Sequence, residues 1–386
     1  MKKIISFLNT DIKIINSYFL FTIVLIILVC VGYSSYALFS FTKTSNNVIE
    51  GTVGDLSKSG TDTLIKLTNN KDNSGLYTII HPADNTLQIG TNESVTEYRY
   101  RGASPKNYVT FNNEVWRIIG VFPTDDGTGK IENRIKLVKD QSIGNKLWDD
   151  GTTAYNYTKN DNLMLLQDNN KSKVEYLEKK DKYDVMLTAP ELGSESNNWA
   201  GPATLNTELN TTYLNSLDST AQNMIGNTKY YLGGKEPIWN NGFVDTPLQF
   251  YSYERKIQNT TSNEFYNGTN PNSFIGKLGL MYVSDYGYAS SNCENKKIWD
   301  DSNSSSNDIR ACNTTNWLYN IKKDEWLLPQ EASDRFNGVS VLSDGRVGSG
   351  NVIIDQFAVR PVLYLISSVQ IAGGNGTSSS PYTLGL

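Results

Sequence analysis

The stretch of residues 107–122, NYVTFNNEVWRIIGVF, constrains the fold more than any other part of the chain. Its two apolar-rich arms flank the pair Asn112-Asn113, and asparagine tolerates a positive φ better than any residue except glycine. The pattern therefore predicts a β-hairpin with the two asparagines at its tip and Trp116 in its second arm. We expect the chain after this hairpin to form one large domain.

The stretch of residues 359–366, VRPVLYLI, predicts the strand that closes this domain. It is apolar on both faces, which is typical of a central strand. Pro361 lacks a backbone donor and is expected at the start of the strand. We expect this strand to lie near the Trp116 strand in the same sheet, so that the two ends of the domain meet.

Turn residues and apolar periodicity predict further elements. Asp126-Gly127 and Ser343-Asp344-Gly345 each predict the turn of a hairpin. Residues 204–225 carry apolar side chains at helical spacing. Within them, Ser219 and Gln222 fit a capping box, which predicts two short helices and not one.

Other segments carry weaker patterns. Residues 229–232, 247–253 and 277–283 are expected to form short strands or loop arms between Gly-, Asn- and Pro-rich turns. Residues 160–192 are more charged, and we expect them to form a partly helical insertion on the surface.

The N-terminus predicts export. Three lysines precede the uncharged run of residues 18–31, and Ser35-Tyr36-Ala37 offers small residues for a cleavage site. The uncharged stretch continues through Phe41, long enough to cross about 30 Å of bilayer hydrocarbon. Residues 1–37 are therefore expected to be either a signal peptide or a membrane anchor. The expected location is extracellular or at the cell surface, followed by a small β module or spacer over residues 38–97.

Cysteine usage agrees with export. Cys30 lies in the apolar segment, which leaves Cys293 and Cys312 as the only two in the exported part. An even pair in an oxidising compartment predicts a disulfide, worth about 3 kcal/mol for a loop of this size. The competing interpretation is a pair of catalytic or metal-binding thiols, although cysteine metal sites usually need four ligands.

Charge and motifs exclude several classes of function. Net charge is −5, and removing residues 1–37 leaves 32 basic and 39 acidic side chains, so nucleic acid is not an expected partner. No phosphate-binding glycine motif precedes a helix. The only histidine, His81, is expected in a loop outside the main domain, where it is badly placed as the base of a catalytic triad.

Five segments together resemble a known family: WRIIG, LNTELNTTYL, GLMYVSDYGYASSNC, WLLP and VRPVLYL. In this order they are similar to exported proteins of Gram-positive gut Firmicutes that carry a C-type-lectin-like domain. That fold is shared with the formylglycine-generating, sulfatase-modifying enzymes and with the variable proteins of diversity-generating retroelements. The resemblance covers residues 98–386 and implies a loop-rich α+β domain whose long loops form a binding face. It departs from the family in lacking the active-site cysteine pair and the Glu-Pro-Asn calcium motif.

Aromatic side chains in the loop-rich half are the candidate ligand-binding residues. Flat rings beside amides suit sugar rings and protein partners, because the ring buries apolar area while the amides bind hydroxyls. The competing interpretation is that such rings anchor loops to the core, above all Trp116 and Trp326. The candidates are Trp199, Trp239, Tyr286, Tyr288, Trp299 and Trp317.

Carboxylates provide the remaining candidates. Asp300, Asp301 and Asp308 crowd into the loop between the two cysteines and form the calcium candidate, the only cofactor expected. The pairs Asp125-Asp126 and Asp149-Asp150 could serve a glycosidase, but aspartates beside glycine are also what turns require.

These patterns leave three hypotheses. The one we favour is a non-enzymatic, adhesin-like binding protein with an extracellular glycan or protein ligand, in contact with the membrane if residues 1–37 are uncleaved. The alternatives are an extracellular glycoside hydrolase that uses loop carboxylates and a subunit of a fibre or pilus.

Overall fold

The structure of this chain is a computed structural model. It covers residues 59–90, 92–149, 163–167, 174–180, 183–187, 199–200, 203–233, 245–256, 271–298, 307–319, 321–331 and 337–386. The N-terminal segment of residues 1–37 lies outside these ranges. Among the residues covered, no helix is both long and apolar enough to cross a membrane.

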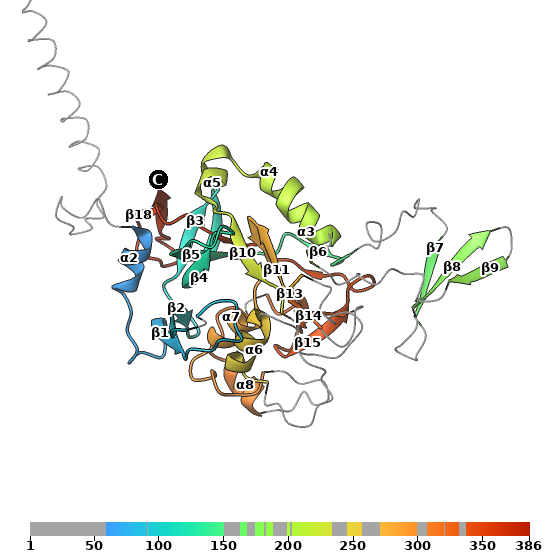
Figure 1. The fold of residues 1–386 in the computed structure, drawn as a ribbon, viewed down its shortest axis with the longest axis horizontal. Coiled ribbons are helices and arrows are strands. Elements are labelled where there is room, and N and C mark those ends of the chain that lie inside the picture. Colours follow the sequence, from blue (N-terminus) through green and yellow to red (C-terminus); the bar gives the residue numbers. More distant parts are fainter. Residues whose placement is uncertain are drawn as a thin grey trace, which may run out of the picture. The chain divides into compact units, whose positions relative to one another are not determined.

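A seven-stranded antiparallel sheet forms the centre of the fold (Figure 1). Its main path runs β1-β2-β4-β5-β17-β12, and β3 pairs with β4 off this path. The strands are β1 (Gly75–His81), β2 (Val95–Arg101), β3 (Tyr108–Phe111), β4 (Glu114–Asp125), β5 (Ile131–Lys139), β12 (Leu278–Gly279) and β17 (Val362–Tyr364).

The β3–β4 hairpin confirms the prediction from residues 107–122. Asn112 and Asn113 occupy its turn with φ of 53° and 57°, and Phe111 pairs with Glu114 across it. Two consecutive positive φ values define the type I′ turn, whose twist matches that of the strands. Trp116 follows in β4, fully buried, with its ring edge-on to Phe111.

The closing strand also lies where the sequence predicts. β17 pairs with β5, and β5 pairs with β4, so the two ends of the predicted domain share one sheet with a single strand between them. Val362 and Leu363 are completely buried. Pro361 precedes the strand, and its carbonyl accepts a hydrogen bond from the Lys139 N–H at 3.0 Å.

The expected boundary between residues 97 and 98 falls inside this sheet and is wrong. β1 pairs along its whole length with β2, and β2 pairs with β4. Helix α2 (Gly60–Ile65) joins the same body, since the Gly60 N–H donates to the Val369 carbonyl at 2.8 Å. Residues 58–386 form one compact unit. Short apolar runs between turns look alike in a spacer and in a strand whose partner is distant in sequence.

The helical stretch is interrupted as predicted, but its second cap lies one residue earlier. The segments are α3 (Thr204–Glu208), a π-helical turn (Leu209–Tyr213), α4 (Leu214–Ser216) and α5 (Ser219–Met224). Leu217 is extended and separates the two parts. Asp218, and not Ser219, caps α5, because its carboxylate accepts the Ala221 N–H at 2.7 Å.

Residues 247–255 form helix α6 (Pro247–Arg255), where the sequence predicted a strand or loop arm. Thr246 and Gln249 make a reciprocal capping box, and Pro247 stands in the first turn, where its missing N–H costs nothing. The predictions of short strands at residues 229–232 and 277–283 agree better with the structure. β10 (Thr228–Tyr231) pairs with β11 (Ser273–Gly276), and the third segment supplies β12 before helix α7 (Val283–Tyr288) begins.

A second sheet has five strands in the order β15-β14-β13-β16-β6. The turn at Ser343-Asp344-Gly345 joins β14 to β15 as predicted, and Gly345 supplies a φ of 83°. Trp326 in β13 packs edge-on against Trp148, which in turn contacts Trp199. The strands are β6 (Asn145–Lys146), β13 (Glu325–Gln330), β14 (Asn337–Val341), β15 (Val347–Asn351) and β16 (Phe357–Ala358).

The charged insertion contains strands, so the expectation of partial helix is wrong for the residues that are described there. β7 (Leu163–Gln167), β8 (Val174–Lys180) and β9 (Tyr183–Leu187) pair antiparallel. The remaining elements are α8 (Asn307–Asn313), β18 (Gln370–Gly373) and β19 (Thr383–Gly385), and the structure as a whole is mixed, with more strand than helix.

The Asn112-Asn113 turn gives a direct test of the hairpin. Asn113→Val places a β-branched residue in the left-handed region, which costs about 1–2 kcal/mol. We expect the free energy of unfolding in urea to fall by that amount. Asn113→Gly is the matched control, because glycine adopts this conformation freely, and it should leave stability nearly unchanged. Equal stability of the two variants would show that the turn does not require a positive φ.

Candidate functional site

The candidate ligand-binding aromatics that the structure describes are interior side chains. Trp199 is completely buried, and Tyr286, Tyr288 and Trp317 expose 2 to 3% of their surface. Side chains buried to this extent offer almost no surface to a ligand, which argues against these four as ligand-binding residues. Trp239 and Trp299 lie outside the described residues.

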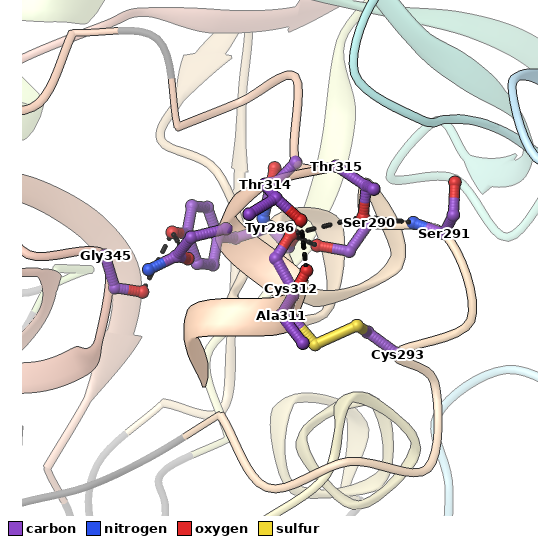
Figure 2. The surroundings of a disulfide bond; sticks show 11 residues. Tyr286, Ser290, Ser291, Cys293, Ala311, Cys312, Thr314, Thr315 and Gly345 are labelled. Atoms are coloured by element: carbon purple, nitrogen blue, oxygen red, sulfur yellow. Dashed lines mark hydrogen bonds between the residues drawn. A yellow bond between two sulfur atoms is a disulfide. The ribbon is translucent and has the colours of Figure 1, made fainter. Parts of the chain in front are cut away.

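These rings anchor loops, which is the competing interpretation of the sequence. Trp317 donates from Nε1 to the Tyr100 carbonyl at 2.9 Å and so ties the segment after α8 to β2. The Tyr286 hydroxyl donates to the Gly345 carbonyl at 2.9 Å, joining α7 to the β14–β15 turn (Figure 2). Loops lack the repeating backbone hydrogen bonds of helices and sheets, so buried aromatic side chains hold them in place.

Cys293 and Cys312 form the predicted disulfide, with Cα atoms 5.9 Å apart. Figure 2 shows the bond beside the end of α8, where the Ser290 hydroxyl donates to the Cys312 carbonyl at 3.1 Å. Both half-cystines are buried. The bonded sulfurs favour the disulfide over the interpretation as catalytic or metal-binding thiols.

The calcium candidate stays a prediction. Asp300, Asp301 and the side chain of Asp308 lie outside the described residues. Among the residues that are described, no three His, Cys, Asp or Glu side chains are grouped as a metal site requires. Asp125 and Asp126 instead make the β4–β5 turn: Asp125 accepts the Gly127 N–H and Asp126 accepts the Thr128 N–H, both at 2.8 Å.

A surface hollow of about 310 Å³ beside strands β6 and β16 is the candidate binding site. Its floor includes the half-buried ring of Phe357, and most of its other lining side chains are exposed and polar. It is lined by Asn145, Lys322, Lys323, Asp324, Ser343, Gln356 and Phe357.

Asp324 joins the segments that surround this hollow. Its carboxylate accepts the Ser343 N–H at 2.7 Å, and its carbonyl accepts the Ala358 N–H at 2.8 Å. The Phe357 ring lies 4.5 Å from that of Trp326, which is itself buried. The ring in the floor is therefore held by the core and not by a mobile loop.

The hollow carries more positive than negative charge. Lys322 and Lys323 are exposed, and Lys322 has a φ of 49°, in the left-handed region. The only carboxylate among the lining residues, Asp324, is already engaged by a backbone N–H. This local charge contrasts with the net charge of −5 of the whole chain.

A second group of polar residues is enclosed by the central sheet and helices α6 and α7. Glu97 Oε2 lies 3.1 Å from His81 Nε2 and accepts the Nε–H of Arg99 at 2.9 Å. Arg99 also donates to Asp285 Oδ1 at 2.9 Å, and Lys136 Nζ lies 2.5 Å from Asp285 Oδ2. All five side chains are at most 3% exposed.

Helix α6 extends this buried group. Arg255 donates to Glu254 at 2.8 Å, and Glu254 accepts the Ser284 hydroxyl from the first turn of α7. Glu97 and Arg255 line a small cavity of about 10 Å³, roughly the room that one water molecule needs.

Burial shifts the pKa values of this group in different directions. Desolvation lowers the pKa of His81 below 6.5, although Glu97 opposes the shift. Desolvation likewise lowers the pKa of Lys136 to about 8, against the attraction of Asp285. Burial alone would raise the pKa of Asp285, but the Lys136 ammonium and the Arg99 guanidinium outweigh it and hold that pKa below its ordinary value.

The sequence interpretation missed both sites, although it contained a signal for one of them. His81 lies at the end of β1, stacked on Tyr251 with ring centroids 3.5 Å apart, so the prediction of a loop residue is wrong. Glu97 and Arg99 alternate in VTEYRYR and so share one face of a strand, and Lys136 interrupts an apolar run. Charges at inward-facing strand positions indicate buried ion pairs.

Comparison with known proteins returned no relative: no protein family, curated protein or solved structure matches this chain.

The buried histidine predicts a loss of stability in mild acid. Below pH 6.5 the unfolded chain protonates its only histidine while folded His81 stays neutral, so the unfolded state binds more protons. We expect the free energy of unfolding to fall as the pH decreases below 6.5. His81→Gln keeps a donor toward Glu97 but does not titrate, and it should weaken this dependence. Urea denaturation on both sides of pH 6.5 provides the measurement, and identical slopes for both proteins would contradict the assignment.

Proposed function

We propose that this protein is an exported, non-enzymatic binding protein, secreted or held at the cell surface by its N-terminal segment, with an extracellular glycan or protein as ligand. The observation that carries the proposal is the hollow beside β6 and β16. Its volume of about 310 Å³ reaches the lower end of the range typical of small-ligand sites, about 300–1,000 Å³.

The chemistry of the hollow supports a polar ligand that has one flat apolar face. Phe357 offers an aromatic surface, and the amides of Asn145 and Gln356 can each donate to and accept from hydroxyl groups. The ammonium groups of Lys322 and Lys323 add three donors each. An aromatic ring beside amides is the combination that was expected around the candidate tryptophans and tyrosines. In the hollow it occurs on different residues.

The packing around the hollow supports binding with little rearrangement. Asp324 fixes the β14–β15 turn and β16 through its two hydrogen bonds. The adjoining Glu325 carboxylate accepts two hydrogen bonds from Arg360, at 2.6 and 2.8 Å, in the interior. A preformed site loses less conformational entropy when it binds.

We also propose that the domain is C-type-lectin-like. Three observations support this: the β3–β4 hairpin and the strand β17 share a sheet, long connections separate them, and a disulfide closes one of these connections. The participation of β1 and β2 in the central sheet places an additional hairpin before the region of resemblance.

A glycan array probed with the full-length chain tests the proposal. The double variant Lys322→Ala, Lys323→Ala should weaken binding at least about tenfold, which corresponds to about 1.4 kcal/mol. Lys130→Ala is the matched control, because Lys130 is 68% exposed in the β4–β5 turn, and it should bind as the parent does.

Two results would contradict the proposal. Binding that is unchanged in the double variant would exclude the hollow as the site. Release of sugar from a polysaccharide, abolished by Asp324→Asn, would favour the alternative of a carboxylate-based hydrolase.

A further inference from the structure

Lys136 and Asp285 form an unusually enclosed contact between the central sheet and helix α7. Lys136 comes from β5 and Asp285 from the first turn of α7, 149 residues apart in the chain. Their Nζ and Oδ2 atoms are 2.5 Å apart, and neither side chain has any exposed surface. This brings an amine and a carboxyl group together out of water.

Aromatic rings surround the amine. The Nζ atom lies 4.3 Å from the ring centroid of Tyr282, 5.1 Å from that of Tyr364 and 5.5 Å from that of Phe122. Desolvation by this environment lowers the pKa of Lys136 to about 8, so near neutral pH part of the population carries an uncharged amine. An uncharged amine is a nucleophile, and the ammonium is not.

The carboxyl group of Asp285 is held in one orientation. Asp285 Oδ1 accepts a hydrogen bond from Arg99 at 2.9 Å, and Oδ2 accepts the Tyr282 N–H at 2.9 Å. Arg99 is thus placed to stabilise negative charge on Oδ1 if a nucleophile adds to the carboxyl carbon. Asp285 cannot turn away, because both of its oxygens are bound.

We propose that Lys136 and Asp285 condense to an intramolecular amide cross-link. A proton first moves from Nζ to Oδ2, which converts the ion pair into a neutral amine and a carboxylic acid. The Nζ lone pair then adds to Cγ, with the charge on Oδ1 facing Arg99. The Cγ–Oδ2 bond breaks, Oδ2 leaves with its own proton and a second proton from Nζ as one water molecule, and the amide remains. No oxidant or co-reactant is needed.

The surroundings fit both the product and the water. The small cavity of about 10 Å³ is lined by Phe122 and Tyr364, two of the rings around Nζ, and has about the room that one water molecule needs. Condensation also removes one positive and one negative charge together, which leaves the rest of the buried group balanced. Its basic members are Lys136, Arg99 and Arg255, and its acidic members are Asp285, Glu97 and Glu254.

Proximity lowers the entropic cost of the step. Groups held in contact react with effective molarities of about 10⁵–10⁸ M, and this contact is held by the packing of two elements. The cross-link does not depend on the proposed ligand, and its test is separate from the glycan array.

Mass spectrometry of the full-length chain tests the cross-link. After reduction of the disulfide and digestion with trypsin, residues 135–139 should be recovered covalently joined to residues 278–296. The joined peptide should lack the mass of one water molecule, and trypsin should not cleave after Lys136. Quantitative recovery of the two peptides unlinked, with cleavage after Lys136, would overturn the proposal, since the contact would then be an ion pair only.

Variants identify the reacting atoms. Lys136→Arg should abolish the joined peptide. Asp285→Asn should form the same amide by losing ammonia, and its joined peptide should have the same mass as that of the parent. Lys139→Arg is the matched control on the same strand, because Lys139 pairs with Glu114 at 2.7 Å in a partly exposed position, and it should keep the cross-link. A joined peptide that persists in Lys136→Arg would overturn the assignment of the nucleophile.

Discussion

The pairing of opposite charges inside the central sheet is the constraint on which the rest of the domain depends. Arg99 connects Glu97 on its own strand with Asp285 on α7, and Glu97 also faces His81 on β1. Removing one partner of such a buried pair costs about 3–5 kcal/mol, because an uncompensated charge stays in the interior. The same contacts require β1, β2 and α7 to assemble together, and this is why residues 75–101 belong to the main domain.

Large aromatic rings hold the loops against the core, as the ion pairs hold the central sheet to helix α7. Trp148 meets both Trp199 and Trp326 edge-on, which joins the start of the α3 segment to the five-stranded sheet. Trp317 reaches β2 through a hydrogen bond to Tyr100. Aromatic side chains buried in this way hold irregular chain segments in place.

Local chemistry made part of the fold predictable from the sequence. The Asn112-Asn113 turn, the turn at Gly345 and the apolar strand after Pro361 depend on neighbouring residues, and all three are confirmed. Helix α6 was missed although Thr246, Pro247 and Gln249 provide a local start signal. The role of His81 was missed because its partners Glu97 and Tyr251 lie on other elements. For the candidate site, aromatic content indicated the kind of side chain, but no local pattern distinguishes a buried ring from an exposed one. None of the residues that line the hollow was predicted to bind a ligand.

The hollow is connected to the buried charges of the core by a continuous series of contacts. Arg360, just before β17, binds Glu325 in β13 and the Leu318 carbonyl, which connects the second sheet to the strand that closes the first. Glu325 is adjacent to Asp324, which holds the rim of the hollow, so the residue that holds the rim is next in sequence to an ion pair in the core. Force that a ligand exerts on this rim would therefore be transmitted to the core ion pair, and not to a hinge. A hollow held in this way keeps its shape as long as the central sheet stays intact.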